Sequence, residues 1–401
     1  MTQKQLLKQI ITPELHKLFE ILAPDECRLV GGLVRDYLLG QVSSDVDICT
    51  TAEPTVVIEK LTKAGIKTIP TGIKHGTITV VMNHHTFEVT TLRKDIQTDG
   101  RHAVVAFTDS FEEDAARRDF TFNALYMDLD GNITDYFKGK EDLETLTVRF
   151  IGNAESRIDE DYLRILRYFR FFARFNSTYC PEDVKQVMSD KARLVATLSV
   201  ERITDEVLKI LTTRNPSVAW KIMDDIGLLE QLGLHPADHA SLNDLAILFP
   251  EERNPLVRIG ALYNEKGKVF VTRDPKLRFS NSQSKFLKSL MKALNNIPHY
   301  TAPEHLAYRL GKDVAAAAFE IDAARSGSTD TRHDCLQASK VVKDFKTPDF
   351  PIKGADLINK GVPAGEKVGQ ILTEVEEWWI EEDFPGKSSC LKHLEEVISK
   401  N

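Results

Sequence analysis

The chain has 401 residues, 42% of them hydrophobic and 28% charged, and a formal net charge of −8. These are ordinary globular values, which exclude a disordered or fibrous protein, and the length suggests roughly two to four domains. No run of about 18 apolar residues occurs, so a transmembrane helix is excluded as well. The N-terminal segment carries charges within a helical pattern and lacks the apolar core of a signal peptide. We therefore expect a cytoplasmic protein with no membrane partner.

The cysteine spacing and the distribution of charge bear on two questions: whether the protein has disulfides or a zinc site, and whether it can bind a polyanion. The five cysteines are widely spaced and contain no CxxC pair, which argues against a disulfide framework and a structural zinc site. Residues 146–215 carry 12 Lys and Arg against 10 Asp and Glu, a net charge of +2, whereas residues 1–145 carry 16 against 23, a net charge of −7. A basic stretch on an acidic protein can still bind a polyanion, because the local field decides binding.

The first part of the chain has the pattern of a mixed α/β unit built on a sheet that looks antiparallel. Helices are predicted over 5–22, 34–39 and 54–63, and strands over 27–30, 46–49, 77–82 and 86–92. From about residue 159 onward the pattern is almost wholly helical, with a polar stretch at 263–282 and helices at 283–295, 303–310, 314–325 and 368–380. We therefore predict an α+β fold, in which an N-terminal mixed sheet with helices precedes an all-α remainder.

Two glycines, Gly31 and Gly32, lie between a predicted strand and a predicted helix. Such a turn lets the backbone approach a phosphate, and Arg35 adds a positive charge beside it. Asp45 and Asp47 follow on the next predicted strand, where a spacing of two points both carboxylates to one face. Two carboxylates so placed suit Mg²⁺ that bridges the phosphates of a nucleotide. The alternative is a pair of surface acids on a solvated edge strand.

Glu88 is a third candidate acid, in the middle of the predicted strand 86–92 and in an apolar context. A buried carboxylate without a partner is costly, so a strand Glu usually has a cation or faces water. Glu88 either shares the metal ions of Asp45 and Asp47 or is an ordinary solvent-facing residue.

Adjacent arginines, Arg117 and Arg118, open a second motif with the sequence RRDFTFNA. Because neighbouring side chains project differently, at least one guanidinium can face a triphosphate and make bidentate contacts there. Asp119 could orient one of the two. The alternative is the start of a helix with surface arginines.

A third motif, EDYLRILRYFR, covers residues 160–170. On a helix Asp161 and Arg164 are neighbours, so they form either an ordinary ion pair or an edge that reads a base. In the second case Asp161 accepts the exocyclic amine of C or A, Arg164 donates to the adjacent ring position, and U and G leave groups unpaired. Arg167 and Arg170 continue along the helix and could reach phosphates.

These motifs, in this order, resemble those of the class II tRNA nucleotidyltransferase and bacterial poly(A) polymerase family of the polymerase-β superfamily. The resemblance implies that Asp45 and Asp47 are catalytic Mg²⁺ ligands, and the residues themselves add Glu88 as a third catalytic candidate. It implies nucleotide binding by Gly32, Arg35, Arg118, Asp161, Arg164, Arg167 and Arg170.

The resemblance also implies a head, neck, body and tail, with the nucleotide held between head and neck. We place the catalytic head at 1–145, a helical neck that selects the nucleotide at 146–215, a helical body at 216–280 and a tRNA-binding tail at 281–401. Residues 93–103 match a flexible loop of members that add a complete CCA end.

The expected function is addition of C, C and A to the 3′ end of tRNA from CTP and ATP, with no nucleic-acid template and no obligate protein partner evident. A poly(A) polymerase is the alternative in the same class, but its bacterial members typically carry a strongly basic tail, and residues 380–401 contain five acids. A partial enzyme that adds only CC or only A is another alternative. A non-catalytic RNA-binding module is disfavoured because Asp45, Asp47, Asp161 and Arg164 are all present.

Overall fold

The computed structural model describes residues 2–43, 45–98, 103–263, 277–297 and 302–400. The chain divides into two compact units, Met1–His235 and Pro236–Asn401. This division does not test the four-part organisation expected from the sequence, whose boundaries stay a prediction.

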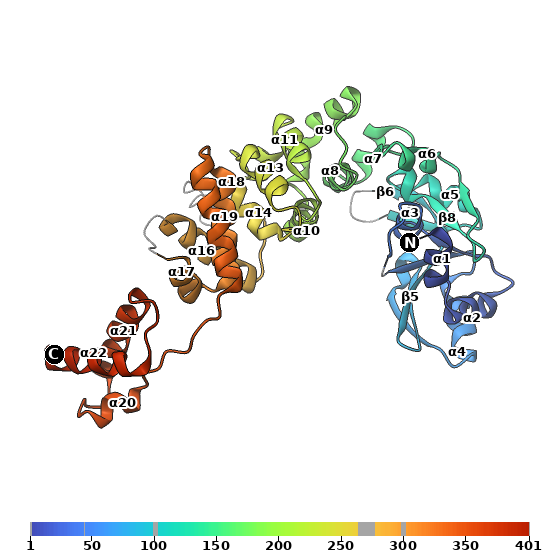
Figure 1. Cartoon of the computed structure of the whole chain (residues 1–401). Coiled ribbons are helices and arrows are strands. Elements are labelled where there is room, and N and C mark those ends of the chain that lie inside the picture. Colours follow the sequence, from blue (N-terminus) through green and yellow to red (C-terminus); the bar gives the residue numbers. More distant parts are fainter. Residues whose placement is uncertain (1, 44, 99–102, 264–276, 298–301, 401) are drawn as a thin grey trace. The chain divides into compact units, whose positions relative to one another are not determined.

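The first unit contains a seven-stranded sheet with the order β3-β4-β5-β2-β1-β8-β9 (Figure 1). Its strands are β1 Cys27–Val30, β2 Val46–Thr50, β3 Lys67–Gly72, β4 Thr77–Met82, β5 His85–Thr91, β8 Leu125–Met127 and β9 Ile133–Asp135. All neighbours pair antiparallel except β2 and β5, which run parallel. The mixed sheet is therefore confirmed, and its single parallel pairing brings β5 beside the strand that carries Asp47.

Strands β6 Arg93–Thr98 and β7 Ala103–Phe107 pair antiparallel in a separate two-stranded sheet. The loop that we expected over 93–103 therefore begins as a strand. Its residues 99–102 lie outside the described part of the chain.

The prediction of a single helix over 5–22 is wrong. The chain forms two helices there, α1 Gln3–Ile10 and α2 Pro13–Leu22. Thr12 is extended and its side chain accepts the N–H of Leu15, and Pro13 occupies the first turn, where its missing N–H costs nothing. The remaining α-helices of this unit are α3 Gly32–Leu38, α4 Pro54–Lys63, α5 Phe111–Ala116, α6 Gly139–Glu144, α7 Ala154–Glu160, α8 Leu163–Arg174, α9 Glu182–Val195, α10 Val200–Leu211, α11 Ser217–Asp225 and α12 Leu228–Gln231.

The described elements of the second unit are all helices, which together with the sheet confirms the α+β class. They are α13 His239–Leu248, α14 Pro255–Leu262, α16 Asn281–Asn296, α17 Pro303–Leu310, α18 Lys312–Arg325, α19 Thr329–Asp344, α20 Gly354–Asn359, α21 Glu366–Glu381 and α22 Lys387–Lys400. The polar stretch predicted over 263–282 falls mostly outside the described residues, and α16 begins within it.

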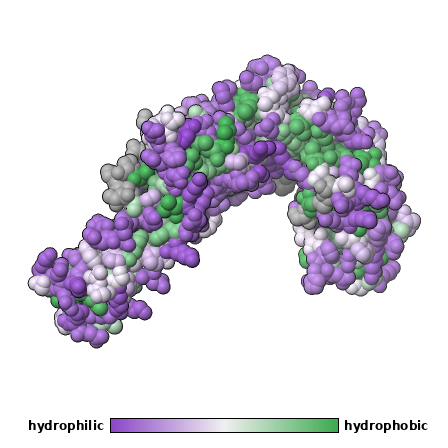
Figure 2. Space-filling view, viewed as in Figure 1, coloured by the Kyte–Doolittle hydropathy of each residue, from purple (hydrophilic) through white to green (hydrophobic). Residues whose placement is uncertain are grey.

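Two apolar clusters stabilise the second unit, one around the Ala-rich α18 and one around Trp379 between α21 and α22. Hydrophilic residues dominate the visible surface of the segment that holds α20, α21 and α22 (Figure 2). Across the described residues of both units, no helix is both long and apolar enough to cross a bilayer. The cytoplasmic location expected from the sequence stays a prediction.

Candidate active site

A cavity of about 390 Å³ in the first unit collects side chains from the sheet region and from α8. Seven arginines and three aspartates are among its lining residues, which are Gly31, Gly32, Arg35, Asp47, Arg117, Arg118, Asp119, Asn123, Asp161, Leu163, Arg164, Arg167, Arg170, Phe171 and Arg202. Every residue that the sequence singled out for nucleotide binding is included. A larger cavity of about 850 Å³ between residues 145–155 and 175–187 contains only one arginine. The charge of the smaller cavity suits a polyphosphate.

The Gly-Gly turn forms one wall of this cavity. Gly31 follows β1 and caps the N-terminus of α3 with φ +71° and ψ −123°, a conformation that favours glycine. A Cβ atom added at Gly31 would lie 3.5 Å from Nη1 of Arg118, and one added at Gly32 would lie 3.6 Å from Arg35. The strand–turn–helix order expected from the sequence is therefore confirmed, and bare backbone lies against two of the arginines.

Two of the three predicted catalytic acids, Asp45 and Asp47, lie at the start of β2, and Glu88 lies in the middle of β5. Asp47 is paired in parallel register with Glu88, and Asp45 comes directly before β2. Burial, the Glu88 charge and the Asp45 charge together raise the pKa of Asp47 above its ordinary value. Asp45 and Glu88 are exposed, so Glu88 faces water on the side of the sheet where it interacts with Asp47.

These acids fit a metal ion that is completed by substrate. Within the described residues, no group of three or more His, Cys, Asp or Glu side chains is close enough to hold a metal ion by itself. Mg²⁺ is usually held by one or two carboxylates together with water and substrate phosphates. Asp45 and Asp47 would supply two oxygen ligands of such a site, and the Asp45 charge that raises the pKa of Asp47 is a repulsion that a cation would relieve.

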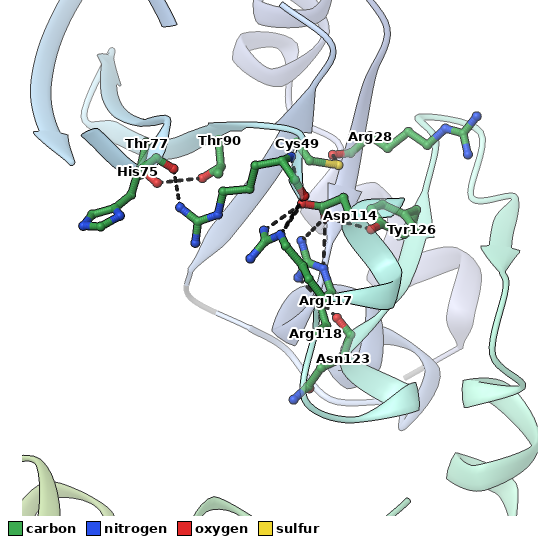
Figure 3. Close-up of polar contacts among 11 residues, drawn as sticks. Arg28, Cys49, His75, Thr77, Thr90, Asp114, Arg117, Arg118, Asn123 and Tyr126 are labelled. Atoms are coloured by element: carbon green, nitrogen blue, oxygen red, sulfur yellow. Dashed lines mark hydrogen bonds and ion pairs between the residues drawn. The ribbon is translucent and has the colours of Figure 1, made fainter. Parts of the chain in front are cut away.

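Asp114, on α5, organises the two adjacent arginines (Figure 3). Its carboxylate accepts hydrogen bonds from Nε and Nη2 of Arg117 at 2.9 and 2.7 Å, from Nε and Nη2 of Arg118 at 3.1 and 2.9 Å, and from the Tyr126 hydroxyl at 2.8 Å. Burial acts to raise the pKa of Asp114, but Arg118 and Arg117 outweigh it and bring the pKa to about 2.

The expectation that Asp119 orients one of these arginines is therefore wrong. Asp114 lies three and four residues before them, in the last turn of α5, and the sequence analysis missed it although this spacing is visible in the sequence.

Asp119 instead holds an arginine of α8. Its carboxylate accepts Nε of Arg167 at 2.7 Å and Nδ2 of Asn123 at 3.1 Å. Burial acts to raise the pKa of Asp119, and the Arg167 charge reverses this and lowers it. A second carboxylate, Asp36, accepts Nε of Arg35 and Nη2 of Arg174, both at 2.8 Å. Two acids of the sheet region thus fix α8 beside the cavity.

Asp161 and Arg164 do not form the ion pair that was the simpler interpretation of their spacing. α7 ends at Glu160, and Asp161 is extended with φ −159° and ψ 108°, so the two residues do not share a helix. Oδ1 of Asp161 accepts the N–H of Leu163 at 3.1 Å, and Oδ2 accepts Nη2 of Arg202 at 2.6 Å. Arg164 donates to the Glu160 carboxylate and to the carbonyl of Arg157. Both side chains line the cavity, each held by other residues.

Helix α10 and Phe171 complete the support of the cavity, and the sequence reasoning missed both. Arg202 and Glu206 lie one turn apart on α10, and Glu206 accepts Nη1 of Arg170 at 2.9 Å. The guanidinium groups of Arg35 and Arg170 lie 5.0 and 4.6 Å from the centre of the Phe171 ring. The one available signal was the position of Phe171 directly after Arg170 in α8.

The turn, the acids of β2 and the arginine-lined cavity define a nucleotidyltransferase. Three family models match the chain: a Poly A polymerase head domain over residues 27–149, a probable RNA and SrmB-binding site of polymerase A over 181–237, and a putative tRNA nucleotidyltransferase domain 2 over 275–394. The mitochondrial CCA tRNA nucleotidyltransferase 1 of Mus musculus is 34% identical over 394 residues, which cover 94% of this chain and 88% of the relative. The CCA-adding enzyme of Lactobacillus johnsonii is 35% identical, with coverage of 92% and 93%. The chain belongs to the CCA-adding enzyme family of tRNA nucleotidyltransferases.

Solved structures agree with this assignment. The CCA-adding enzyme of Bacillus stearothermophilus in complex with CTP superposes with a TM-score of 0.75 at 27% identity, covering 100% of this chain and 98% of that one. The Thermotoga maritima CCA-adding enzyme complexed with tRNA has a TM-score of 0.69 at 20% identity, with coverage of 99% of both chains, and supports the fold. Nucleotidyltransferases of the CCA-adding type generally use a divalent metal ion.

Proposed function

We propose that this chain adds CMP, CMP and AMP in turn to the 3′ end of tRNA, using CTP and ATP and releasing pyrophosphate. The observation that carries the proposal is the cavity in which seven arginines surround Asp47 and Asp161. Membership of the CCA-adding family supports the same substrates, because its relatives are named for this addition.

In the proposed reaction the 3′-hydroxyl oxygen of the tRNA forms a bond to the α-phosphorus of the nucleotide. The bond from that phosphorus to the bridging oxygen breaks, and pyrophosphate leaves. Asp45 and Asp47 would hold Mg²⁺, which when bound supplies positive charge to the reacting phosphate and the leaving group. Glu88, which is exposed and paired in register with Asp47, would accept the hydroxyl proton.

The arginines of the cavity would bind the triphosphate. Arg118, Arg167 and Arg170 are each held by a carboxylate, of Asp114, Asp119 and Glu206 respectively. Because these guanidinium groups are already fixed, little side-chain freedom is lost when the nucleotide binds. Gly32 adds close approach of the backbone, and Arg35 adds a further charge at the same wall.

Asp161 and Arg164 would read the base. Asp161 offers a carboxylate that can accept the exocyclic amine of C or A, and Arg164 offers donors to the neighbouring ring atom. U and G place a carbonyl where C and A place the amine, so a buried group would be left unpaired. The separate support of the two side chains favours this role over a mutual ion pair.

The proposal is tested by incubating a tRNA transcript that lacks its CCA end with CTP, with ATP, with both and with UTP or GTP. We expect two additions with CTP alone and three with CTP and ATP, resolved on a sequencing gel. Long products with ATP alone would indicate a poly(A) polymerase instead. Failure to extend tRNA with any nucleotide would overturn the proposed function.

A further inference from the structure

Helix α16 stands out in the second unit by its charge. Its 16 residues include Lys285, Lys288 and Lys292 and no acidic residue. Among the described helices of ten or more residues, only α8 and α16 combine basic side chains with a complete absence of acids. The chain as a whole is acidic, with a net charge of −8, so an unopposed basic helix is unusual within it.

The three lysines lie on one face of α16. At about 100° per residue they fall within an arc of about 60°, on the side opposite the apolar residues. Leu290 and Ala293 of that apolar side belong to the cluster around α18, and Leu287 is buried as well. α16 contacts α14, α17 and α18, with which Figure 1 shows it in one helical group. The helix is therefore held by packing, with its lysines turned outward.

All three lysine side chains are exposed, and none has a described carboxylate oxygen within 4.0 Å of its ammonium nitrogen. Three exposed lysines on helices of the first unit differ in this respect. Lys63, Lys209 and Lys221 each bond to an acid four residues away on the same helix, Glu59, Asp205 and Asp225. The lysines of α16 therefore keep their charge available to an external anion.

We propose that Lys285, Lys288 and Lys292, here named the α16 lysine stripe, bind the phosphate backbone of tRNA. The inference rests on the proposed function, which makes tRNA the polyanion that this chain must hold. A lysine ammonium is a point charge on a flexible stem, which suits sequence-independent contact with successive phosphates. The stripe contributes affinity for tRNA and takes no part in nucleotide binding or chemistry.

The test is a triple variant, Lys285→Gln, Lys288→Gln and Lys292→Gln, compared with wild type across a salt series. Binding of a labelled tRNA transcript is followed by fluorescence anisotropy, which needs no chemistry. Each lost phosphate contact lowers the slope of log affinity against log salt by about 1, so we expect the slope to fall by about 3. At a fixed low salt concentration we expect affinity to fall by about tenfold or more.

A matched control carries Lys63→Gln, Lys209→Gln and Lys221→Gln, which change the net charge by the same amount. We expect its salt slope and its tRNA affinity to match wild type. An equal loss in both triple variants would show that only overall charge matters and would overturn the stripe. An unchanged salt slope in the α16 variant would also overturn the proposal for the stripe. In that case the proposed function would still hold, provided that the wild-type protein adds CCA to tRNA. If wild type binds tRNA without extending it, the proposed function fails, and the slope still decides the stripe.

Discussion

Helices α8 and α16 both carry basic side chains and no acidic residue. They differ in whether these basic side chains are held by carboxylates of other elements. The arginines of α8, at positions 164, 167, 170 and 174, bond to the carboxylates of Glu160, Asp119, Glu206 and Asp36. The lysines of α16 are exposed and have no described acid beside them. A small ligand with fixed geometry needs cations that are fixed in advance. A long flexible polyanion can be bound by cations that remain mobile.

The comparison of α8 with α16 assigns the chemical step to the first unit. Asp47→Asn tests this assignment, and we expect it to lower kcat more than any other variant. Loss of one metal-binding carboxylate should lower kcat for both C and A addition by about a thousandfold. Asp130→Asn, at an exposed turn, is the matched control and should behave as wild type. Turnover of Asp47→Asn within tenfold of wild type would remove this residue from the reaction.

Asp114 tests whether the arginines are fixed by buried carboxylates. Its pKa of about 2 lies below the ordinary value of 3.8, so its ionised form stabilises the folded state above about pH 4, and this contribution is lost as the pH falls toward 2. Asp114→Asn leaves Arg117 and Arg118 without their acid and should cost about 3–5 kcal/mol at neutral pH. Urea denaturation should show the deficit shrinking between pH 4 and pH 2.5. A deficit that does not change with pH would mean that the charge of Asp114 is not what stabilises this region.

Asp161→Ala tests base reading at the junction between α7 and α8. Without the carboxylate, UTP and GTP lose the penalty of an unpaired group, so the preference for C over U should fall by about ten- to a hundredfold. The measurement is kcat/KM for all four nucleotides. Arg202→Ala frees the Asp161 side chain and also removes a cation that lines the cavity, and it should give a smaller loss of the same kind. A wild-type C-to-U ratio in Asp161→Ala would show that another residue reads the base.

Phe171→Leu gives the smallest expected effect. The ring lies against both Arg35 and Arg170, and each cation–π contact contributes about 0.5–1 kcal/mol. We expect KM for CTP and for ATP to rise about two- to fivefold with base preference unchanged. Phe175→Leu is the control, because Phe175 belongs to the same aromatic cluster, where it contacts Phe122 and Phe171. Equal effects of the two variants would reduce Phe171 to a packing residue.

Local features of the fold and of the site could be predicted from the sequence, because they depend on residues that are neighbours in the chain. The Gly31-Gly32 turn and the alternating β-strands fall into this group. The break at Thr12 and Pro13 was readable too, from its capping residue and proline, but the apolar periodicity across it predicted one helix.

The contacts that fix α8 were not readable. Asp119 and Arg167 are 48 residues apart, and Asp36 and Arg174 are 138 apart. Pairings over such separations depend on how α8 packs against the sheet region. Arg202 and Glu206 are similar cases, since their roles follow from the position of α10 beside α8.

Steady-state kinetics in which CTP and tRNA are varied separately test the division between α8 and α16 most directly. Arg167→Lys keeps the charge but loses the planar, bidentate group, so KM for CTP should rise about tenfold while KM for tRNA stays at the wild-type value. The triple glutamine variant of the α16 lysine stripe should show the reverse. If either variant raises both KM values by the same factor, the two helices do not bind different substrates, and the comparison is wrong.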